Sequence, residues 1–178
     1  MRKLLDQKDK QLGQKSKADT EIEKTVESAL TEDVMKKLSA WQIVPKAVEH
    51  DVKLGSGSFG VVFEGKYRER AVAIKTMAQE KINDENMQRF VQEILLMSRL
   101  HHPNIIGFVG CVLDKDNLSI ILEYAKKGDL KMVQLTGAGQ KWTFHNHKLR
   151  VLLETVRAME YLHSLDPIVI HGEQPRGF

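Results

Sequence analysis

The residues best placed to do chemistry lie between Leu54 and Lys75. Gly55, Gly57 and Gly60 give this stretch a G-x-G-x-x-G spacing. Because glycine has no Cβ, a loop with this spacing can fold tightly and bring its backbone N–H groups close to phosphate oxygens. The stretch therefore predicts a loop that binds a phosphorylated ligand.

The glycine spacing alone does not decide the class of site, since dinucleotide-binding Rossmann units carry it too. A Rossmann glycine loop opens a helix. Here the third glycine is followed by Val61-Val62-Phe63, and such β-branched and aromatic residues indicate a strand. A turn at Glu64-Gly65 and a short polar link then lead to a second strand, Ala71–Lys75. We expect a β-hairpin with the glycine loop at its head.

These two strands resemble the protein kinase family, whose signature is a G-x-G-x-x-G-x-V loop followed by V-A-I-K. Val62 fills the valine of the first motif, and Val72-Ala73-Ile74-Lys75 fills the second without a mismatch. Two motifs in the right order are more specific than either alone. The resemblance implies an α+β fold: a kinase amino-terminal lobe, made of a five-stranded antiparallel sheet plus the αC helix, with the first helices of the second lobe.

The composition excludes several classes of protein. Hydrophobic residues make up 42% and charged residues 29% of the 178 residues, a balance typical of a globular domain. The net charge of +3 is too small to indicate nucleic acid or a membrane surface as a partner, and no apolar run approaches the length of a membrane span. Cys111 is the one cysteine, so we expect a buried structural thiol in the reducing cytoplasm.

Three parts are expected along the chain. They are a charged helical amino-terminal extension (1–47), the kinase amino-terminal lobe (48–124), and the hinge with an incomplete start of the carboxy-terminal lobe (125–178). Residues 1–18 are polar and mostly positive. We interpret them as a solvated segment or, alternatively, as a contact for an acidic surface.

An amphipathic helix is expected within the extension. A possible capping box, Thr20-x-x-Glu23, precedes apolar residues at near-helical spacing. These residues are Ile22, Val26, Leu30, Val34 and Leu38. The repeat is too short for a coiled coil, so we expect this helix to pack on the domain that follows.

A second amphipathic helix follows Lys75, with Asn83 or Asp84 as its cap. Its apolar face is formed by Met87, Phe90, Val91, Ile94, Met97 and Leu100. In the resemblance this helix is αC, and Glu93 is the acid that pairs with Lys75. A carboxylate at salt-bridge distance would hold the lysine in one direction among phosphates.

The remaining strands of the lobe are expected at Ile106–Leu113 and Leu118–Tyr124. The resemblance then implies a hinge at Glu123-Tyr124-Ala125, whose backbone would bind the adenine edge, with Leu122 as gatekeeper. Asp129 is either a ribose ligand or a helix N-cap. The residues expected to bind nucleotide are Leu54, Gly55, Ser56, Gly57, Ser58, Phe59, Gly60, Val62, Ala73, Lys75, Leu122, Glu123, Tyr124, Ala125 and Asp129, and Lys75 and Glu93 form the catalytic pair.

From about His147 another helix is expected, which resembles the kinase helix αE. Leu149, Leu152, Leu153, Val156, Met159 and Leu162 keep helical spacing. Asp166-Pro167 ends it, and Ile168–His171 is expected to form a strand. With most of the second lobe missing, the apolar face of helix 147–164 would be exposed and would favour self-association.

The resemblance fails after His171. Gly172 and Glu173 stand where the family has the arginine and aspartate of H-R-D-x-x-x-x-N, and the 178 residues contain no D-F-G. The resemblance thus implies ATP as the ligand, but the protein ligands of the family's Mg²⁺ are absent. We expect no metal site and no catalysis, and we carry no catalytic role over to Glu173.

Three interpretations of this departure stay open. The chain is a fragment, a truncated product or a frame-shifted form of an active kinase; a non-catalytic, pseudokinase-like binding or regulatory module; or an unrelated structural domain, which the motifs make remote. The intact glycines and Lys75 favour the first. Reading the gene downstream of His171 in all three frames would distinguish the first two.

The chain resembles the tyrosine-kinase-like group, which is mostly specific for serine and threonine, in three short segments. These are Trp41-x-Ile43, Ala71–Lys75 and Leu122-Glu123-Tyr124. The resemblance implies a protein substrate and phosphoryl transfer from ATP. His101 and His102 are adjacent, but no Cys, Asp or Glu stands near them at ligand spacing, so we do not assign them to a metal.

Overall fold

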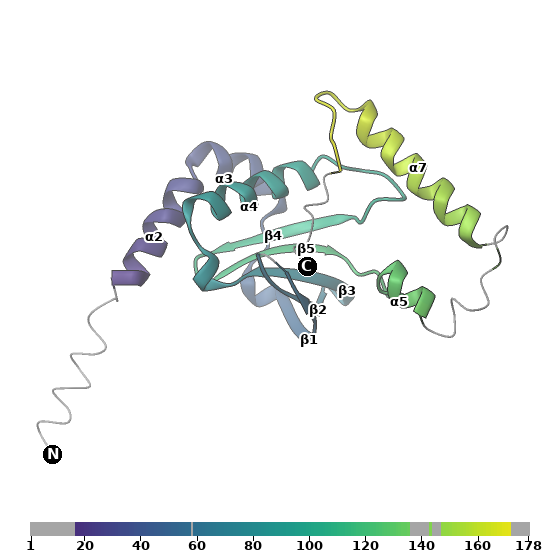
Figure 1. Ribbon diagram of the computed structural model, residues 1–178. Coiled ribbons are helices and arrows are strands. Elements are labelled where there is room, and N and C mark those ends of the chain that lie inside the picture. Colours follow the sequence, from purple (N-terminus) through teal and green to yellow (C-terminus); the bar gives the residue numbers. More distant parts are fainter. Residues whose placement is uncertain (1–16, 58, 136–142, 144–146, 172–178) are drawn as a thin grey trace, which may run out of the picture. The chain divides into compact units, whose positions relative to one another are not determined.

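The computed structural model describes residues 17–57, 59–135, 143 and 147–171 (Figure 1). In chain order the elements are α2 (Lys17–Ala29), α3 (Glu32–Leu38), the 3-10 helices η1 (Ser39–Trp41) and η2 (Pro45–Ala47), β1 (Val48–Ser56), β2 (Gly60–Tyr67), β3 (Arg70–Met77), the 3-10 helix η3 (Gln79–Lys81), α4 (Asp84–Met97), β4 (Phe108–Asp114), β5 (Asn117–Glu123), α5 (Leu130–Leu135) and α7 (Leu149–Ser164). They form two compact units, Met1–Arg99 with Val109–Leu122 and Leu100–Phe108 with Glu123–Phe178.

The first unit is built on one sheet. Its strand order is β1-β2-β3-β5-β4, and β2 pairs antiparallel with both β1 and β3. Figure 1 shows α4 running along this sheet with α2 and α3 beside it. This arrangement confirms the expected α+β class and the five-stranded antiparallel sheet with its αC helix.

The core of the first unit brings together distant parts of the chain. Its buried cluster consists of Ile43, Val48, Val72, Ile74, Val112 and Ile121, with Phe63, Tyr67 and Val109 packed against it. Burying a side chain of this kind stabilises the fold by about 1.5–3 kcal/mol. Alternation along β3 sends Val72 and Ile74 into this cluster, so Ala73 and Lys75 point to the other face of the sheet.

The sequence predicted the turn of the β2–β3 hairpin at Glu64-Gly65, but the turn lies further along the chain. Glu64 and Gly65 pair with β3 inside β2, and the hairpin closes at the pair Tyr67–Arg70. Arg68 and Glu69 form the two-residue turn.

Gly65 is required inside the strand for another reason. A Cβ at this position would collide with the backbone carbonyl of Glu49 and the side chain of Ile74. A glycine in a strand can mark such a close approach as well as a turn, which is why the turn prediction was wrong.

The expected single amino-terminal helix is two helices. Thr31 separates α2 from α3, and its side chain accepts the N–H of Val34 at 3.5 Å as the N-cap of α3. Thr20 lies inside α2, so the predicted capping box is wrong. Threonine favours a helix N-cap over a helix interior because its hydroxyl competes for backbone donors. The expected packing on the following domain is confirmed, since α2 and α3 both contact α4.

The link from α3 to β1 joins the sheet. The Ile43 N–H donates to the Cys111 carbonyl at 2.8 Å, and Gln42 forms a parallel bridge with Cys111. A Cβ at Gly110 would come within 2.6 Å of the Trp41 carbonyl oxygen and the Ile43 side chain. The glycine at position 110 therefore allows the segment to lie directly on β4.

In the second unit, the loop after α4 is tied to α7. The rings of His102 and Tyr161 stack with centroids 5.0 Å apart, and the His101 N–H donates to the Tyr161 hydroxyl at 3.0 Å. His102 Nδ1 also accepts the N–H of Asn104 at 3.2 Å. These contacts give both histidines a structural role.

The predicted strand Ile168–His171 is wrong. These residues adopt no regular structure, and the Val169 N–H donates to the Leu162 carbonyl at 3.1 Å. A strand needs a partner strand for its backbone groups, and no described strand pairs with this segment. Along the ranges that the structure describes, no helix is both long and apolar enough to traverse a bilayer.

We predict that Glu69→Gly stabilises the fold. Arg68 and Glu69 both have positive φ, 48° and 61°, as a two-residue hairpin turn of type I′ requires. Holding a non-glycine residue there costs about 1–2 kcal/mol, so removing the Cβ at position 69 should raise the melting temperature by about 2–4 °C. Lys66→Gly, on an exposed strand residue, is the control and should lower it. An unchanged or lower melting temperature for Glu69→Gly would contradict the strain at this turn.

Candidate functional site

The sheet brings the predicted site residues of three strands into one row. Gly55 on β1 stands opposite Val62 on β2, and Val62 stands opposite Lys75 on β3. Directly paired residues of antiparallel strands point to the same face, and Ala73 shares this face by alternation. The sheet therefore brings Gly55, Val62, Ala73 and Lys75 together on one face.

A bidentate ion pair joins this row to α4. Lys75 Nζ lies 2.7 Å from Glu93 Oε1 and 2.8 Å from Glu93 Oε2. Both side chains are partly buried, with 28% of Lys75 and 31% of Glu93 exposed. The pairing expected from the kinase resemblance is thus present in the structure, and it fixes the direction of the lysine side chain.

The local sequence explains why Glu93 on α4 lies beside Lys75. Asn83 caps the helix, its Oδ1 accepting the N–H of Asn86 at 2.9 Å, as expected for one of the two candidate caps. The buried face of α4 consists of Met87, Phe90, Val91 and Ile94. Glu93 is adjacent to Ile94, so burial of that face leaves the carboxylate at the edge of the helix, where it reaches Lys75.

The three glycines of the loop differ in what they do for the fold. A Cβ at Gly60 would collide with the Thr76 carbonyl and approach Ala78 N to 2.6 Å, and its φ of +154° strains any other residue. A Cβ at Gly55 or Gly57 would meet no atom within 4 Å. Gly60 is therefore required by the protein itself, whereas the space beside Gly55 and Gly57 is left open.

Phe59 contributes a contact that the sequence did not predict. Its ring centroid lies 5.0 Å from Lys75 Nζ, which is a cation–π distance. Its carbonyl oxygen accepts the Ala78 N–H at 3.1 Å, and the Gly57 N–H donates to the Gly60 carbonyl at 2.8 Å. The loop is thus folded onto β3, with an aromatic ring beside the ammonium.

The predicted hinge begins in the second unit. The Glu123 N–H donates to the Gly107 carbonyl at 2.8 Å, and the Glu123 carboxylate accepts the Gly107 N–H at 3.1 Å. The Ala125 carbonyl accepts the Gly128 N–H at 2.9 Å, and Gly128 has a φ of +72°. These bonds shape the segment that the resemblance assigns to adenine.

The other predicted site residues are placed less tightly. Leu54 is 46% exposed and Ser56 is exposed at the end of β1. Leu122 and Tyr124 are half-buried around the end of β5. The Asp129 carbonyl accepts the Val133 N–H at 3.1 Å, so its backbone occupies the N-cap position of α5. Ser58 and Glu173 lie outside the described residues.

Cys111 is a structural thiol, as expected. It is fully buried, and burial raises the pKa of its thiol to about 12. Its Sγ lies 3.8 Å from the Trp41 carbonyl. The thiolate is therefore scarce at neutral pH, and Cys111 is no candidate nucleophile.

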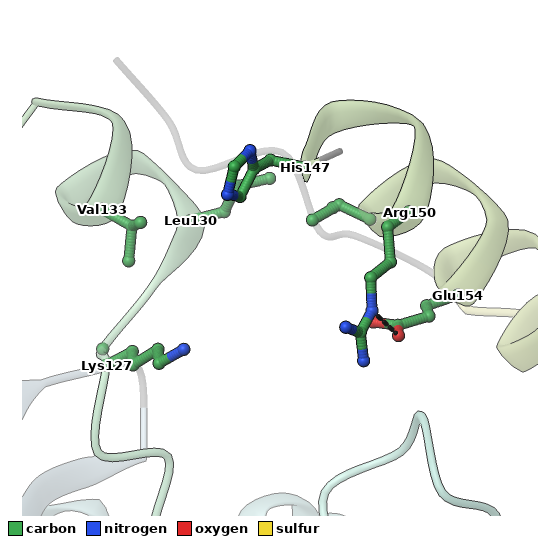
Figure 2. Close-up of a pocket in the computed structure, with 8 residues that line it drawn as sticks. Lys127, Leu130, Val133, His147, Arg150 and Glu154 are labelled. Carbon is green, nitrogen blue, oxygen red and sulfur yellow. Dashed lines mark hydrogen bonds and ion pairs between the residues drawn. The ribbon is translucent and has the colours of Figure 1, made fainter. Parts of the chain in front are cut away.

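A cavity of about 510 Å³ lies between α5 and α7 of the second unit (Figure 2). It is lined by Lys127, Gly128, Leu130, Val133, His147, Arg150, Val151 and Glu154. Figure 2 shows the Arg150 guanidinium bound to Glu154 on the same helix, at 2.8 Å. This pairing compensates the Arg150 charge, so the cavity is a weaker candidate than the face that carries Lys75.

The described residues do not fit the family's magnesium ions. They include no cluster of three or more His, Cys, Asp or Glu side chains able to hold a metal. The groups that the kinase resemblance assigns to phosphates are the glycine loop and the Lys75 ammonium.

We predict that Gly57→Ala and Gly60→Ala have different effects on stability. Gly57→Ala should leave the free energy of unfolding unchanged within about 0.5 kcal/mol, because its Cβ enters open space. Gly60→Ala should lower it by about 1–3 kcal/mol, because the backbone is strained and crowded there. Urea denaturation of the two variants measures both values. Equal losses would show that Gly57 serves the fold and not a ligand.

Comparison with known proteins agrees with this geometry. A family model of protein tyrosine and serine/threonine kinases matches residues 48–173. R826 of Acanthamoeba polyphaga mimivirus, by its name a candidate serine/threonine-protein kinase/receptor, is 37% identical over 136 residues, which are 76% of this chain and 8% of that protein.

Two relatives from Arabidopsis thaliana give the same result. Serine/threonine-protein kinase CTR1 is 33% identical over 122 residues, 68% of this chain and 15% of that protein. Serine/threonine-protein kinase STY17 is 30% identical over 142 residues, 75% of this chain and 23% of that protein. The chain thus spans less than a quarter of the length of each of these relatives. With its hairpin, its Lys75–Glu93 pair and a family match over residues 48–173, the chain belongs to the protein kinase family.

Proposed function

We propose that this chain binds the phosphates of ATP with its glycine loop and Lys75, and the adenine with the hinge at Glu123–Ala125. The observation that carries the proposal is the Lys75–Glu93 pair at 2.7 and 2.8 Å, beside a loop whose Gly55 and Gly57 leave space open. The protein that contains this domain would transfer the γ-phosphoryl group of ATP to a protein substrate.

The donor set of Lys75 supports phosphate binding. An ammonium group has three N–H donors, and the carboxylate of Glu93 has two oxygens to accept them. One donor therefore stays available for a phosphate oxygen. The Phe59 ring, 5.0 Å from Nζ, would cover that donor or move aside when a phosphate arrives.

The open space at Gly55 and Gly57 supports the same reading. Among the described residues other than the immediate chain neighbours, no atom lies within 4 Å of a Cβ built at either position, and neither glycine has a positive φ. The fold alone does not explain glycine at these two sites. A phosphate chain drawn close to the loop backbone would occupy the space that a side chain would fill.

We propose that the 178 residues alone do not transfer the phosphoryl group. In kinases, catalysis consists of positioning and charge stabilisation, in which metal ions bridge the β- and γ-phosphates. The sequence has Gly172 and Glu173 in place of the family's arginine and catalytic aspartate, and it has no D-F-G. Lys75 carries one positive charge and cannot replace a bridging divalent ion. The alternative is a non-catalytic binding or regulatory module. A longer form of such a module would also bind ATP without turnover.

The finer assignment follows the relatives. CTR1 and STY17 are named serine/threonine-protein kinases, and we propose the same specificity and membership of the tyrosine-kinase-like group for this protein. We also propose a cytoplasmic location, on the reducing environment that a lone buried cysteine favours.

We predict that the chain binds ATP and that Lys75→Met weakens binding about tenfold or more, since a hydrogen bond to a charged group is worth about 1.5–3 kcal/mol. Gly57→Ala should weaken binding too, because its methyl group takes the space of the phosphates, while stability stays unchanged. Isothermal titration measures all three dissociation constants. If ATP binds the Lys75→Met chain as tightly as the unchanged chain, the proposed site is wrong.

We predict no phosphoryl transfer by the 178-residue chain. The assay supplies ATP, magnesium and a generic protein substrate, and the Lys75→Met chain is the background. Turnover above that background would contradict the proposal and would direct attention to Glu173.

We further propose that the exposed face of α7 associates with a second copy of the chain. Leu152, Leu153 and Val156 are 55%, 49% and 62% exposed, and such an apolar patch favours association. The double variant Leu152→Glu, Val156→Lys preserves the net charge and places an ion pair at helical i, i+4 spacing. Sedimentation velocity at micromolar concentration should show association for the unchanged chain and a monomer for the variant. A monomeric unchanged chain would contradict the proposal.

A further inference from the structure

The amino-terminal helix α2 packs against the helix that carries Glu93. Both α2 and α3 contact α4, and Figure 1 shows them beside it. Val26 is 5% exposed and is the buried residue among the α2 side chains that the structure describes. Leu38 in α3 is fully buried. This segment precedes the kinase-like part of the sequence, yet it adds to the core of the first unit.

A long-range ion pair ties α2 to the sheet. Glu23 on α2 accepts a hydrogen bond from Lys115, which lies in the turn between β4 and β5. This bond raises the pKa of the Lys115 ammonium above its usual value. The Glu23 side chain is 22% exposed, so the pair is partly shielded from solvent. The pair gives α2 a contact with the turn between β4 and β5, in addition to its packing on α4.

The other end of the segment is fixed as well. Ile43 donates to the Cys111 carbonyl at 2.8 Å and belongs to the buried cluster of the sheet. Gly110 leaves room for this approach. The segment from α2 to Ile43 is therefore held to the sheet at both ends, and α4 lies against it between these two anchors.

We infer that α2 is a positioning element, which holds α4 so that Glu93 stays on Lys75, with Val26 and the Glu23–Lys115 pair as its positioning residues. A helix held on one side by the sheet and on the other by a second helix has less freedom to swing. If α2 leaves, α4 loses one of these supports, and outward movement of α4 would separate Glu93 from Lys75. The amino-terminal segment would thus regulate the phosphate-binding group.

The test follows the position of α4 directly. Nitroxide labels on Arg70→Cys in β3 and Gln92→Cys in α4, both exposed positions, report the distance between the two elements by double electron–electron resonance. Cys111 is buried and should take up no label, which the chain without introduced cysteines checks. We expect Val26→Asp to shift or broaden the distance distribution. Val26→Ile should preserve it, and so should Ser28→Asp, which adds the same charge on the exposed face of α2.

A second variant covers the case in which Val26→Asp does not fold. Lys115→Glu removes the anchor of α2 at an exposed position and should broaden the same distribution. The charge swap Glu23→Lys, Lys115→Glu should restore it. The inference would be overturned if a folded Val26→Asp chain kept the original distance distribution. If Val26→Asp does not fold, the same result for Lys115→Glu would overturn it.

The consequence for binding rests on the nucleotide-binding function proposed above, and it is measured separately. Val26→Asp should weaken ATP binding about tenfold, as Glu93→Gln should, and the double variant should be no weaker than Glu93→Gln alone. Additive losses of ATP affinity would show that α2 does not act through Glu93. A chain that does not bind ATP at all would refute the proposed function, while the label distances would still decide the role of α2.

Discussion

The ion pair between Lys75 and Glu93 is the interaction on which the candidate site depends. It joins a strand and a helix through two residues eighteen positions apart in the sequence, with both carboxylate oxygens within 2.8 Å of one ammonium. Neither partner would be held by the sheet or the helix alone. The register of the hairpin places Lys75 opposite Val62, and the buried face of α4 sets the position of Glu93. Any change that moves β3 relative to α4 therefore acts on the site.

The glycines of the β1–β2 region differ in whether the fold itself requires them. Gly60 is required by crowding against Thr76 and by its positive φ, and Gly65 by the approach of Glu49 on β1. Gly55 and Gly57 have no such requirement. The G-x-G-x-x-G spacing thus combines one residue that shapes the hairpin with two that leave room beside it. Substitution by alanine separates the two groups because only the first carries a structural cost.

Sequence patterns predicted those features that depend on local spacing. The strands around the glycine loop and the Asn83 cap follow from residue types at fixed intervals, whereas the Lys75–Glu93 pair was expected from the kinase resemblance. The features that were missed depend on distant residues. The role of Gly65 depends on Glu49, and the anchoring of α2 depends on Lys115, ninety-two residues beyond Glu23.

Other errors arose where one signal has two meanings. Ile168–His171 has the composition of a strand, but strand formation requires a partner that composition does not supply. Thr20 and Thr31 both suit a helix N-cap, and the structure uses Thr31. Phe59 fits the loop motif, yet its contact with the Lys75 ammonium could not be derived from spacing, because the fold of the loop tip brings the two together.

The most direct test of the account is a double-mutant cycle on ATP affinity with Lys75→Met, Glu93→Gln and the two combined. If Glu93 acts by directing Lys75, its removal should cost affinity only while Lys75 is present, and the double variant should bind as weakly as Lys75→Met alone. Independent, additive losses from the two substitutions would contradict the central claim, because Glu93 would then affect the nucleotide by a route that does not involve the lysine.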